Sequence, residues 1–121
     1  MEQISAVKQR EDRTGVPGYI DFSVSVARED DAVTLYVTGD LDCYTAPRLR
    51  AALLGLVDDG ARQVVLDVGG TQFVDSTGLS VLVGGLKRFR DRGGNMVLRS
   101  PNDTTRRLFE VTGLSTVFEI S

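Results

Sequence analysis

Residues 64–79, VVLDVGGTQFVDSTGL, contain a buried strand, a loop and the start of a helix in direct succession. The continuous apolar run Val64-Val65-Leu66 is typical of central parallel strands that are covered on both faces. Residues 69–74 interrupt this run as a loop. Beyond the loop, apolar side chains recur at the spacing of one helix face, at Leu79, Leu82, Val83, Leu86 and Phe89. The segment therefore predicts a strand that is followed by an amphipathic helix.

The C-terminal side of this segment repeats the alternation of helix and strand. Gly93-Gly94 is expected to end the amphipathic helix, and residues 96–99 predict a short strand. Pro101-Asn102-Asp103 opens a third helix, which Gly113 ends. Residues 117–120 predict a last short strand.

The N-terminal side predicts a hairpin and one more helix. Residues 22–26 and 33–37 alternate apolar and polar side chains, as half-buried strands do, and the polar residues 29–31 between them suggest a tight turn. Thr45 is expected to be the N-cap of a helix, and Pro47 suits its first turn because proline lacks the N–H that would go unpaired there. The apolar face of that helix consists of Leu49, Ala52, Leu53, Leu56 and Val57.

The order of elements is therefore β-β-α-β-α-β-α-β, an α/β fold. Alternating strands and helices predict a mixed sheet in which the later strands are mostly parallel, with the helices packed against it. Residues 21–121 are expected to form this one domain, which suits a chain of 121 residues. Residues 1–20 are polar, lack the apolar core of a secretory signal, and are expected to form a flexible leader.

Composition excludes several classes of function. A formal net charge of -3 gives no general attraction to nucleic acid or to an anionic membrane, and the longest apolar run is too short for a membrane span. There is no histidine, and Cys43 is the only cysteine, so the usual zinc, haem and Cys-His sites lack their residues. We expect a reduced cytoplasmic protein without cofactor or metal, and only a carboxylate magnesium site stays open.

Ser76 occupies the expected N-cap of the helix that follows the loop. In the simpler interpretation, Ser76 is only a cap, whose oxygen accepts the N–H of Gly78 or Leu79, and Gly78 only relieves a steric conflict. In the sharper interpretation, the helix N-terminus favours an anion, so a phosphate on Ser76 would be tolerated by the fold. Its charge of about -2 would lie beside Asp75 and would act mainly on a docked partner.

Three motifs together resemble the STAS-type anti-sigma factor antagonists of bacteria. Residues 74–79, VDSTGL, look like the phosphorylation loop of that family. Residues 39–42, GDLD, with 44–47, YTAP, resemble its other signature. Two positions differ from the usual pattern of the family, which carries Glu at Asp40 and commonly Gly at Ser80, just after the phosphorylation loop. Residues 107–109 and 112–114 resemble its third-helix motif, and the likeness runs from about residue 22 to residue 120.

The resemblance implies a protein-binding switch in transcription regulation and stress response, not an enzyme. Unphosphorylated family members bind an anti-sigma factor that is also a serine kinase, and so free a sigma factor. The kinase then phosphorylates the serine after the loop aspartate, which maps to Ser76, and a metal-dependent serine phosphatase reverses the step. The partner-binding residues implied here are Asp40, Asp42, Thr45, Asp75, Ser76, Thr77 and Gly78. Many relatives also end in a further helix, which is expected to be absent here.

Asp42 and Asp75 follow strand ends on what should be the same edge of the sheet, close to Ser76. Paired carboxylates suit acid–base chemistry or magnesium, but loop carboxylates also commonly bind local backbone N–H groups. We favour a role in shaping the docking surface and presenting Ser76.

Other features have simpler interpretations. Thr77 is a second hydroxyl that could be phosphorylated instead, and Cys43 is expected to be a small buried residue. Gly84-Gly85, inside a helix, is expected to allow close packing on a neighbouring element, and a partner surface is the less favoured interpretation. A solvated helix surface explains the arginines more simply than nucleic acid does, at Arg88, Arg90, Arg92, Arg106 and Arg107.

Two other functions stay open. One is a STAS module that serves as a scaffold or as a subunit of a transport complex without a phosphorylation switch, and it would show no kinase-dependent shift on a native gel. The other is an enzyme that uses Asp42 and Asp75, which would need a substrate-sized cleft between them and turnover without a partner.

Overall fold

The computed structural model describes residues 21–30 and 32–121, and the leader expected over residues 1–20 lies outside them. The elements follow in the order β1 (Ser23–Glu29), β2 (Ala32–Thr38), α1 (Ala46–Asp58), β3 (Gln63–Gly70), α2 (Ser76–Asp91), β4 (Asn95–Arg99), α3 (Asp103–Val111), a 3-10 turn η1 (Leu114–Thr116) and β5 (Glu119–Ile120). This order confirms the predicted α/β fold. The last strand is shorter than expected because η1 precedes it.

The sheet has the strand order β1-β2-β3-β4-β5, the same as the order along the chain. β1 and β2 pair in the antiparallel sense, and every later neighbour is parallel, so the predicted mixed sheet is confirmed. A parallel connection is almost always right-handed, and here each one steps to the next strand in the same direction. All three connecting helices are therefore directed to the same face of the sheet.

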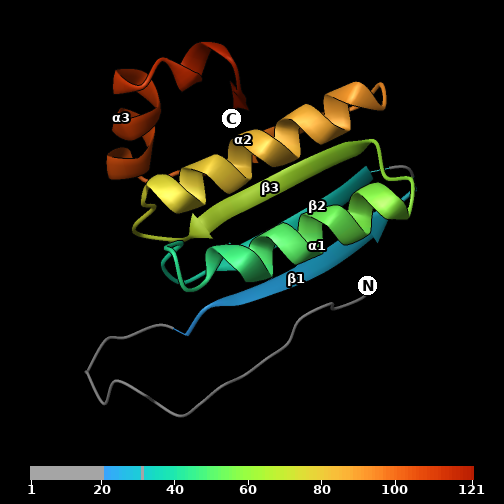
Figure 1. Cartoon of the computed structure of the whole chain (residues 1–121), viewed down its shortest axis with the longest axis horizontal. Helices are drawn as coiled ribbons and strands as arrows, with labels where there is room; N and C mark the ends of the chain where they lie inside the picture. Colours follow the sequence, from blue (N-terminus) through green and yellow to red (C-terminus); the bar gives the residue numbers. More distant parts are fainter. Residues whose placement is uncertain (1–20, 31) are drawn as a thin grey trace.

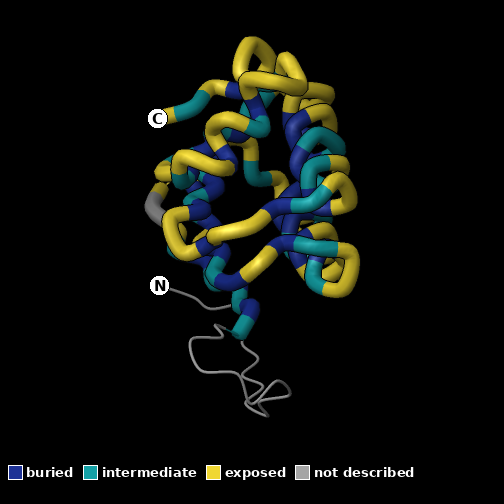
Figure 2. The backbone as a smooth tube through the Cα atoms, turned by 90° about the vertical axis from the view of Figure 1, so that its left-hand side faces the viewer, coloured by how far each residue is buried: buried dark blue, intermediate teal, exposed yellow. Residues whose placement is uncertain are grey.

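Figure 1 shows α1 and α2 lying side by side across that face, with α3 beyond α2. The core lies between them and the sheet, and exposed residues lie in the loops and along the helices (Figure 2). Alternate strand residues point into this core and are buried, among them Val26, Leu35, Leu66 and Leu98.

The expectation that the central strands are covered on both faces is wrong. Val65, which points away from the helices, is only half-buried, and Tyr36, which pairs with Asp67 of the same strand, is 41% exposed. On this open face, the Nε of Arg99 donates to Asp67 at 2.8 Å, and its guanidinium lies 5.8 Å from the Tyr36 ring centroid. The hydrogen bond to Asp67 raises the pKa of Arg99 above its ordinary value, so this group stays protonated unless the solution is strongly alkaline.

The two glycines of α2 differ in their surroundings. A Cβ added to Gly85 would lie 2.9 Å from Cδ1 of Leu53 in α1, which confirms the predicted close packing at that position. A Cβ added to Gly84 would meet nothing within 4 Å, so the prediction is wrong there. Within residues 21–30 and 32–121, no helix combines the length and apolar character required to cross a bilayer.

Candidate functional site

The loops that follow β2 and β3 are joined to each other by their backbones. The N–H of Leu41 donates to the carbonyl of Phe73 at 2.8 Å, and the N–H of Asp75 donates to the carbonyl of Leu41 at 3.0 Å. Leu41 and Val74 thus form a single parallel bridge beyond the ends of the strands. The pairing holds residues distant in sequence in one fixed surface.

Leu41 also supports the first turn of α2. Its side chain is fully buried, and a Cβ added to Gly78 would lie 2.7 Å from its Cγ and 2.8 Å from its carbonyl oxygen. The helix can begin at this place only because Gly78 lacks a side chain. The expected close approach of another backbone to Gly78 is confirmed.

Asp75 connects the two loops through its carboxylate. Oδ1 accepts the N–H of Gly78 at 2.8 Å, and Oδ2 accepts the N–H of Cys43 at 3.1 Å. Asp75 is therefore the N-cap of α2, and the expectation that Ser76 caps this helix is wrong. Aspartate and serine are comparable caps, and here the second acceptor oxygen of the carboxylate also binds the other loop.

Ser76 is the first residue of α2, and its side chain is exposed. Its hydroxyl has no hydrogen-bond partner within the described part of the chain, while its carbonyl accepts the hydroxyl of Ser80 at 3.1 Å. Thr77 is exposed as well. With capping left to Asp75, the Ser76 hydroxyl is available to another protein.

Asp42 and Thr45 organise the first loop. Oδ1 of Asp42 accepts the N–H groups of Tyr44 and Thr45 at 2.9 and 3.0 Å. The Thr45 hydroxyl donates to the carbonyl of Asp40 at 2.8 Å and accepts the N–H of Asp42 at 2.9 Å. Thr45 has the N-cap position of α1 that we predicted, but its side chain makes no cap hydrogen bond to that helix. Local backbone bonds thus engage Asp42, as they do Asp75.

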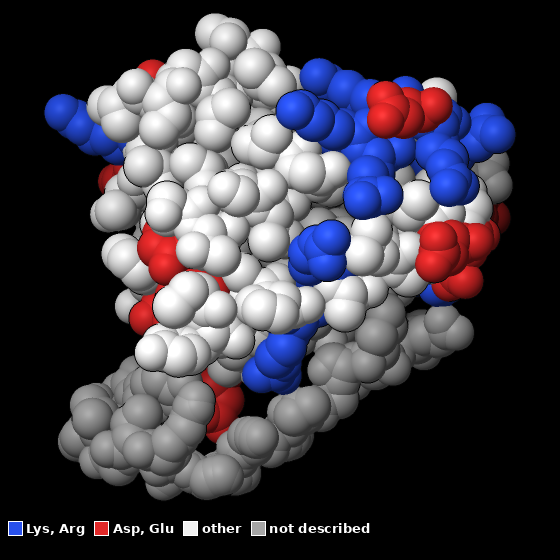
Figure 3. Space-filling model, in the orientation of Figure 1, with Lys and Arg blue, Asp and Glu red and all other residues white. Residues whose placement is uncertain are grey.

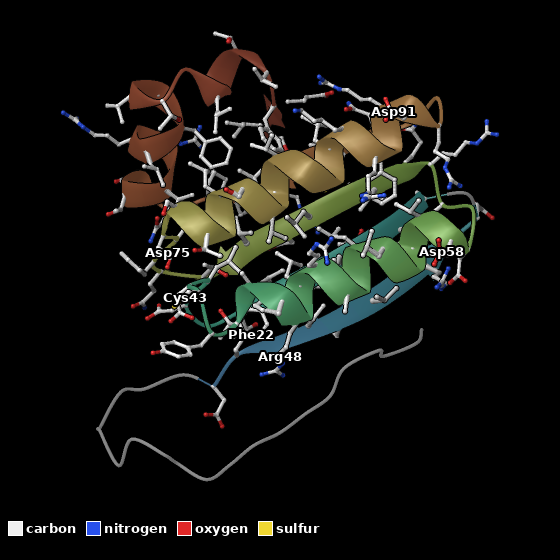
Figure 4. The ribbon with its side chains drawn as sticks, in the orientation of Figure 1. Phe22, Cys43, Arg48, Asp58, Asp75 and Asp91 are labelled. Carbon is white, nitrogen blue, oxygen red and sulfur yellow. The ribbon has the colours of Figure 1, made fainter. Side chains whose placement is uncertain are left out.

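The seven expected partner-binding residues therefore lie in two connected loops and the first turn of α2. Figure 4 shows Cys43 and Asp75 together at the end of the molecule where α1 and α2 begin. The expectation that Cys43 is buried is wrong: its N–H faces Asp75, and the residue is exposed. Among residues 21–30 and 32–121, no group of three or more Cys, Asp and Glu side chains is suited to a metal ion.

Two exposed aromatic residues belong to the same loops and were missed as site residues. Tyr44 is 85% exposed and Phe73 is 48% exposed. Aromatic side chains at protein interfaces often contribute much of the binding energy. The sequence offered one indication of them: each loop contains an aromatic residue that belongs to no predicted strand or helix face.

The carboxylate of Asp75 gives a test of how the loops are held together. Asp75→Ala is expected to lower the free energy of unfolding by about 1–2 kcal/mol, because both the N-cap and the bond to Cys43 are lost. Asp75→Asn keeps one acceptor oxygen for Gly78 and is expected to lie between Asp75→Ala and the parent. Urea unfolding measures the three, and equal stability of Asp75→Ala and the parent would contradict the bridging role.

Comparisons with known proteins agree with this geometry. The profile of the STAS domain family matches residues 23–121. An anti-sigma-B factor antagonist of Listeria monocytogenes is 40% identical over 103 residues, which are 84% of this chain and 90% of that protein. The anti-sigma-B factor antagonist of Bacillus subtilis is 35% identical over 104 residues, 84% of this chain and 93% of that protein. A crystal structure of an anti-sigma factor antagonist from Mycobacterium paratuberculosis superposes with a TM-score of 0.75 at 27% identity, over 83% of this chain and 85% of that one.

Proposed function

The chain belongs to the anti-sigma factor antagonist family of STAS domain proteins, and from this premise we propose that it regulates transcription by binding an anti-sigma factor. The unphosphorylated chain captures an anti-sigma factor that is also a serine kinase, and a sigma factor is set free. The observation that carries this proposal is the exposed hydroxyl of Ser76 at the start of α2, which no described residue hydrogen-bonds.

Phosphorylation of Ser76 dissociates the complex of the chain with the anti-sigma factor. The kinase transfers the terminal phosphoryl group of ATP to the Ser76 oxygen, ADP leaves, and the hydroxyl proton passes to solvent. The new group carries a charge of about -2 and adjoins Asp75, so it opposes an interface formed with the neutral hydroxyl. A serine phosphatase removes the phosphate and restores binding.

The fold is able to accept this charge without unfolding. The phosphate would face the N-terminal end of a helix of 16 residues, where anions are favoured by about 0.3–1 kcal/mol. The loops that contain Leu41 and Asp75 position Ser76, and the hydrogen bonds that hold these loops do not involve the Ser76 hydroxyl. The chain is accordingly a regulatory binding protein, and we place it in the cytoplasm, where a lone thiol stays reduced.

Phosphate mapping tests the assignment. The purified chain is mixed with a candidate kinase and ATP, and the modified residue is identified by mass spectrometry. Ser76→Ala is expected to bind the kinase and to accept no phosphate, whereas Thr77→Ala still accepts phosphate on Ser76. Phosphorylation of Ser76→Ala at the parent level would refute the site, and the lack of any kinase-dependent gel shift would favour the scaffold function.

A further inference from the structure

A groove runs between α1 and α2 on the face opposite the sheet. Its volume is about 280 Å³, and apolar side chains form its floor, among them Leu53, Leu54, Val57 and Val81. Such a volume lies at the lower limit of small-molecule pockets, and the groove is a surface hollow and not an enclosed cavity. Its shape therefore suits side chains of another protein better than an enclosed small molecule.

Gly84 and Gly85 together create this hollow. Gly85 lets α2 approach Leu53 of α1, so the two helices are close at the floor. At Gly84, which lines the groove, an added Cβ would meet nothing within 4 Å. Glycine at an open position within a helix costs about 1 kcal/mol relative to alanine, and no packing contact of the described residues requires it there.

The border of the groove is positively charged. Arg50 of α1 and Arg88 of α2 both line it and both are exposed. Neither guanidinium has an ion pair or hydrogen bond within residues 21–30 and 32–121, and no Asp or Glu lines the groove. Figure 3 shows basic side chains beside an uncharged surface over the two helices, with more of them towards the end of α2.

The groove has the length of a short helix and begins at the phosphorylation loop. Thr77 lines one end and Arg88 the other, and the 11 steps between them span about 16 Å along α2. Three turns of an α-helix cover that distance. Thr77 directly follows Ser76, so the groove continues the surface of the two loops.

We propose that this groove binds an acidic amphipathic α-helix of a partner protein. The apolar face of that helix lies on Leu54, Val57 and Val81, and its carboxylates pair with Arg50 and Arg88. Resting on the function proposed above, the helix belongs to the anti-sigma factor, so one interface extends from Ser76 along the groove. Phosphate at Ser76 then acts on the end of this helix nearest Thr77.

The groove can be tested by itself with a synthetic peptide. The probe is an amphipathic peptide of about three to four turns, with Leu on one face and Glu on the other, and a matched peptide carries Lys in place of Glu. We expect the acidic peptide to shift the backbone amide resonances of residues 53–57 and 80–88 in the full chain, and the basic peptide to leave them in place. Equal shifts with both peptides, or no shifts in these residues, would overturn the proposal.

Variants of the chain locate the contact. Gly84→Gln places a side chain in the groove from a position where its Cβ meets nothing within 4 Å, and it is expected to raise the Kd of the acidic peptide at least tenfold, about 1.4 kcal/mol. The matched control is Gly55→Gln on the exposed side of α1, where an added Cβ also meets nothing within 4 Å, and we expect a Kd within about twofold of the parent. Unchanged affinity of Gly84→Gln would overturn the groove as the binding site.

The charged border has its own pair of variants. Arg88→Glu is expected to weaken binding of the acidic peptide about tenfold, and Arg106→Glu, on the exposed surface of α3, leaves that affinity unchanged.

The parent and the same variants are then measured with the anti-sigma factor. If that protein binds the parent and Gly84→Gln equally, the groove inference fails while the proposed function stands. If the anti-sigma factor binds neither the parent nor any variant while the acidic peptide still binds the groove, the proposed function fails and the groove remains.

Discussion

Ser76→Asp is expected to weaken binding of the anti-sigma factor by roughly 30- to 5,000-fold. The physical reason is that the new carboxylate would be desolvated in the interface, close to Asp75, and an unpaired buried charge costs about 2–5 kcal/mol. Ser76→Asn is the matched control, since it adds a side chain of the same size without the charge. Titration calorimetry on the three purified proteins gives the ratio of their dissociation constants.

The stability of Ser76→Asp separates a surface effect from a folding defect. An acidic residue in the first turn of α2 interacts favourably with the helix dipole, so we expect thermal unfolding at the parent temperature or slightly above it. Weak binding together with an intact fold would establish that charge alone controls docking. Equal affinities of Ser76→Asp and Ser76→Asn would contradict the electrostatic mechanism.

Leu41→Ala is expected to lower the free energy of unfolding by about 2–5 kcal/mol and to abolish binding of the anti-sigma factor. The side chain is fully buried, so its truncation leaves a cavity. That cavity would lie directly under Gly78, where α2 begins, and in the loop that pairs with Phe73 and Asp75. Urea unfolding at constant m-value measures the stability, and calorimetry measures the binding.

Leu66→Ala is the control for this second experiment. Leu66 is equally buried, but it lies in the middle of β3, away from the two loops. It is expected to lose a similar stability of about 2–5 kcal/mol and to keep the affinity of the parent at a temperature where both variants are folded. Equal loss of binding in the two variants would mean that Leu41 acts only through global stability.

The order of strands and helices could be predicted from the sequence because each element has a local signal. Alternation in residues 33–37 marks a strand, and the apolar spacing from Leu79 to Phe89 marks a helix. The neighbourhood of Asp42, Asp75 and Ser76 could be predicted too, since parallel strands end at the same edge of a sheet. Local periodicity was sufficient for the first prediction, and the order of the elements along the chain for the second.

The N-cap of α2 could not be chosen from the sequence. Asp75 and Ser76 are adjacent and are comparable caps, so a local rule does not separate them. The choice depends on the N–H of Cys43, which is 32 residues away and meets the second oxygen of Asp75 only when the two loops lie together. The same folding turns Cys43 outwards, against the expectation, based on how free cysteines usually pack, that it is buried.

Local periodicity in this sequence was sufficient for the elements, their order and the position of the serine at the start of α2. Contacts between distant residues settled the other three features. They decided which side of the sheet stays open, which residue caps α2, and where α1 and α2 leave a groove. These outcomes depend on the handedness of successive parallel connections and on pairs such as Leu41 with Gly78 and Leu53 with Gly85. Such pairs have no local signal, because a residue's partner across the fold is fixed only when the whole chain has packed.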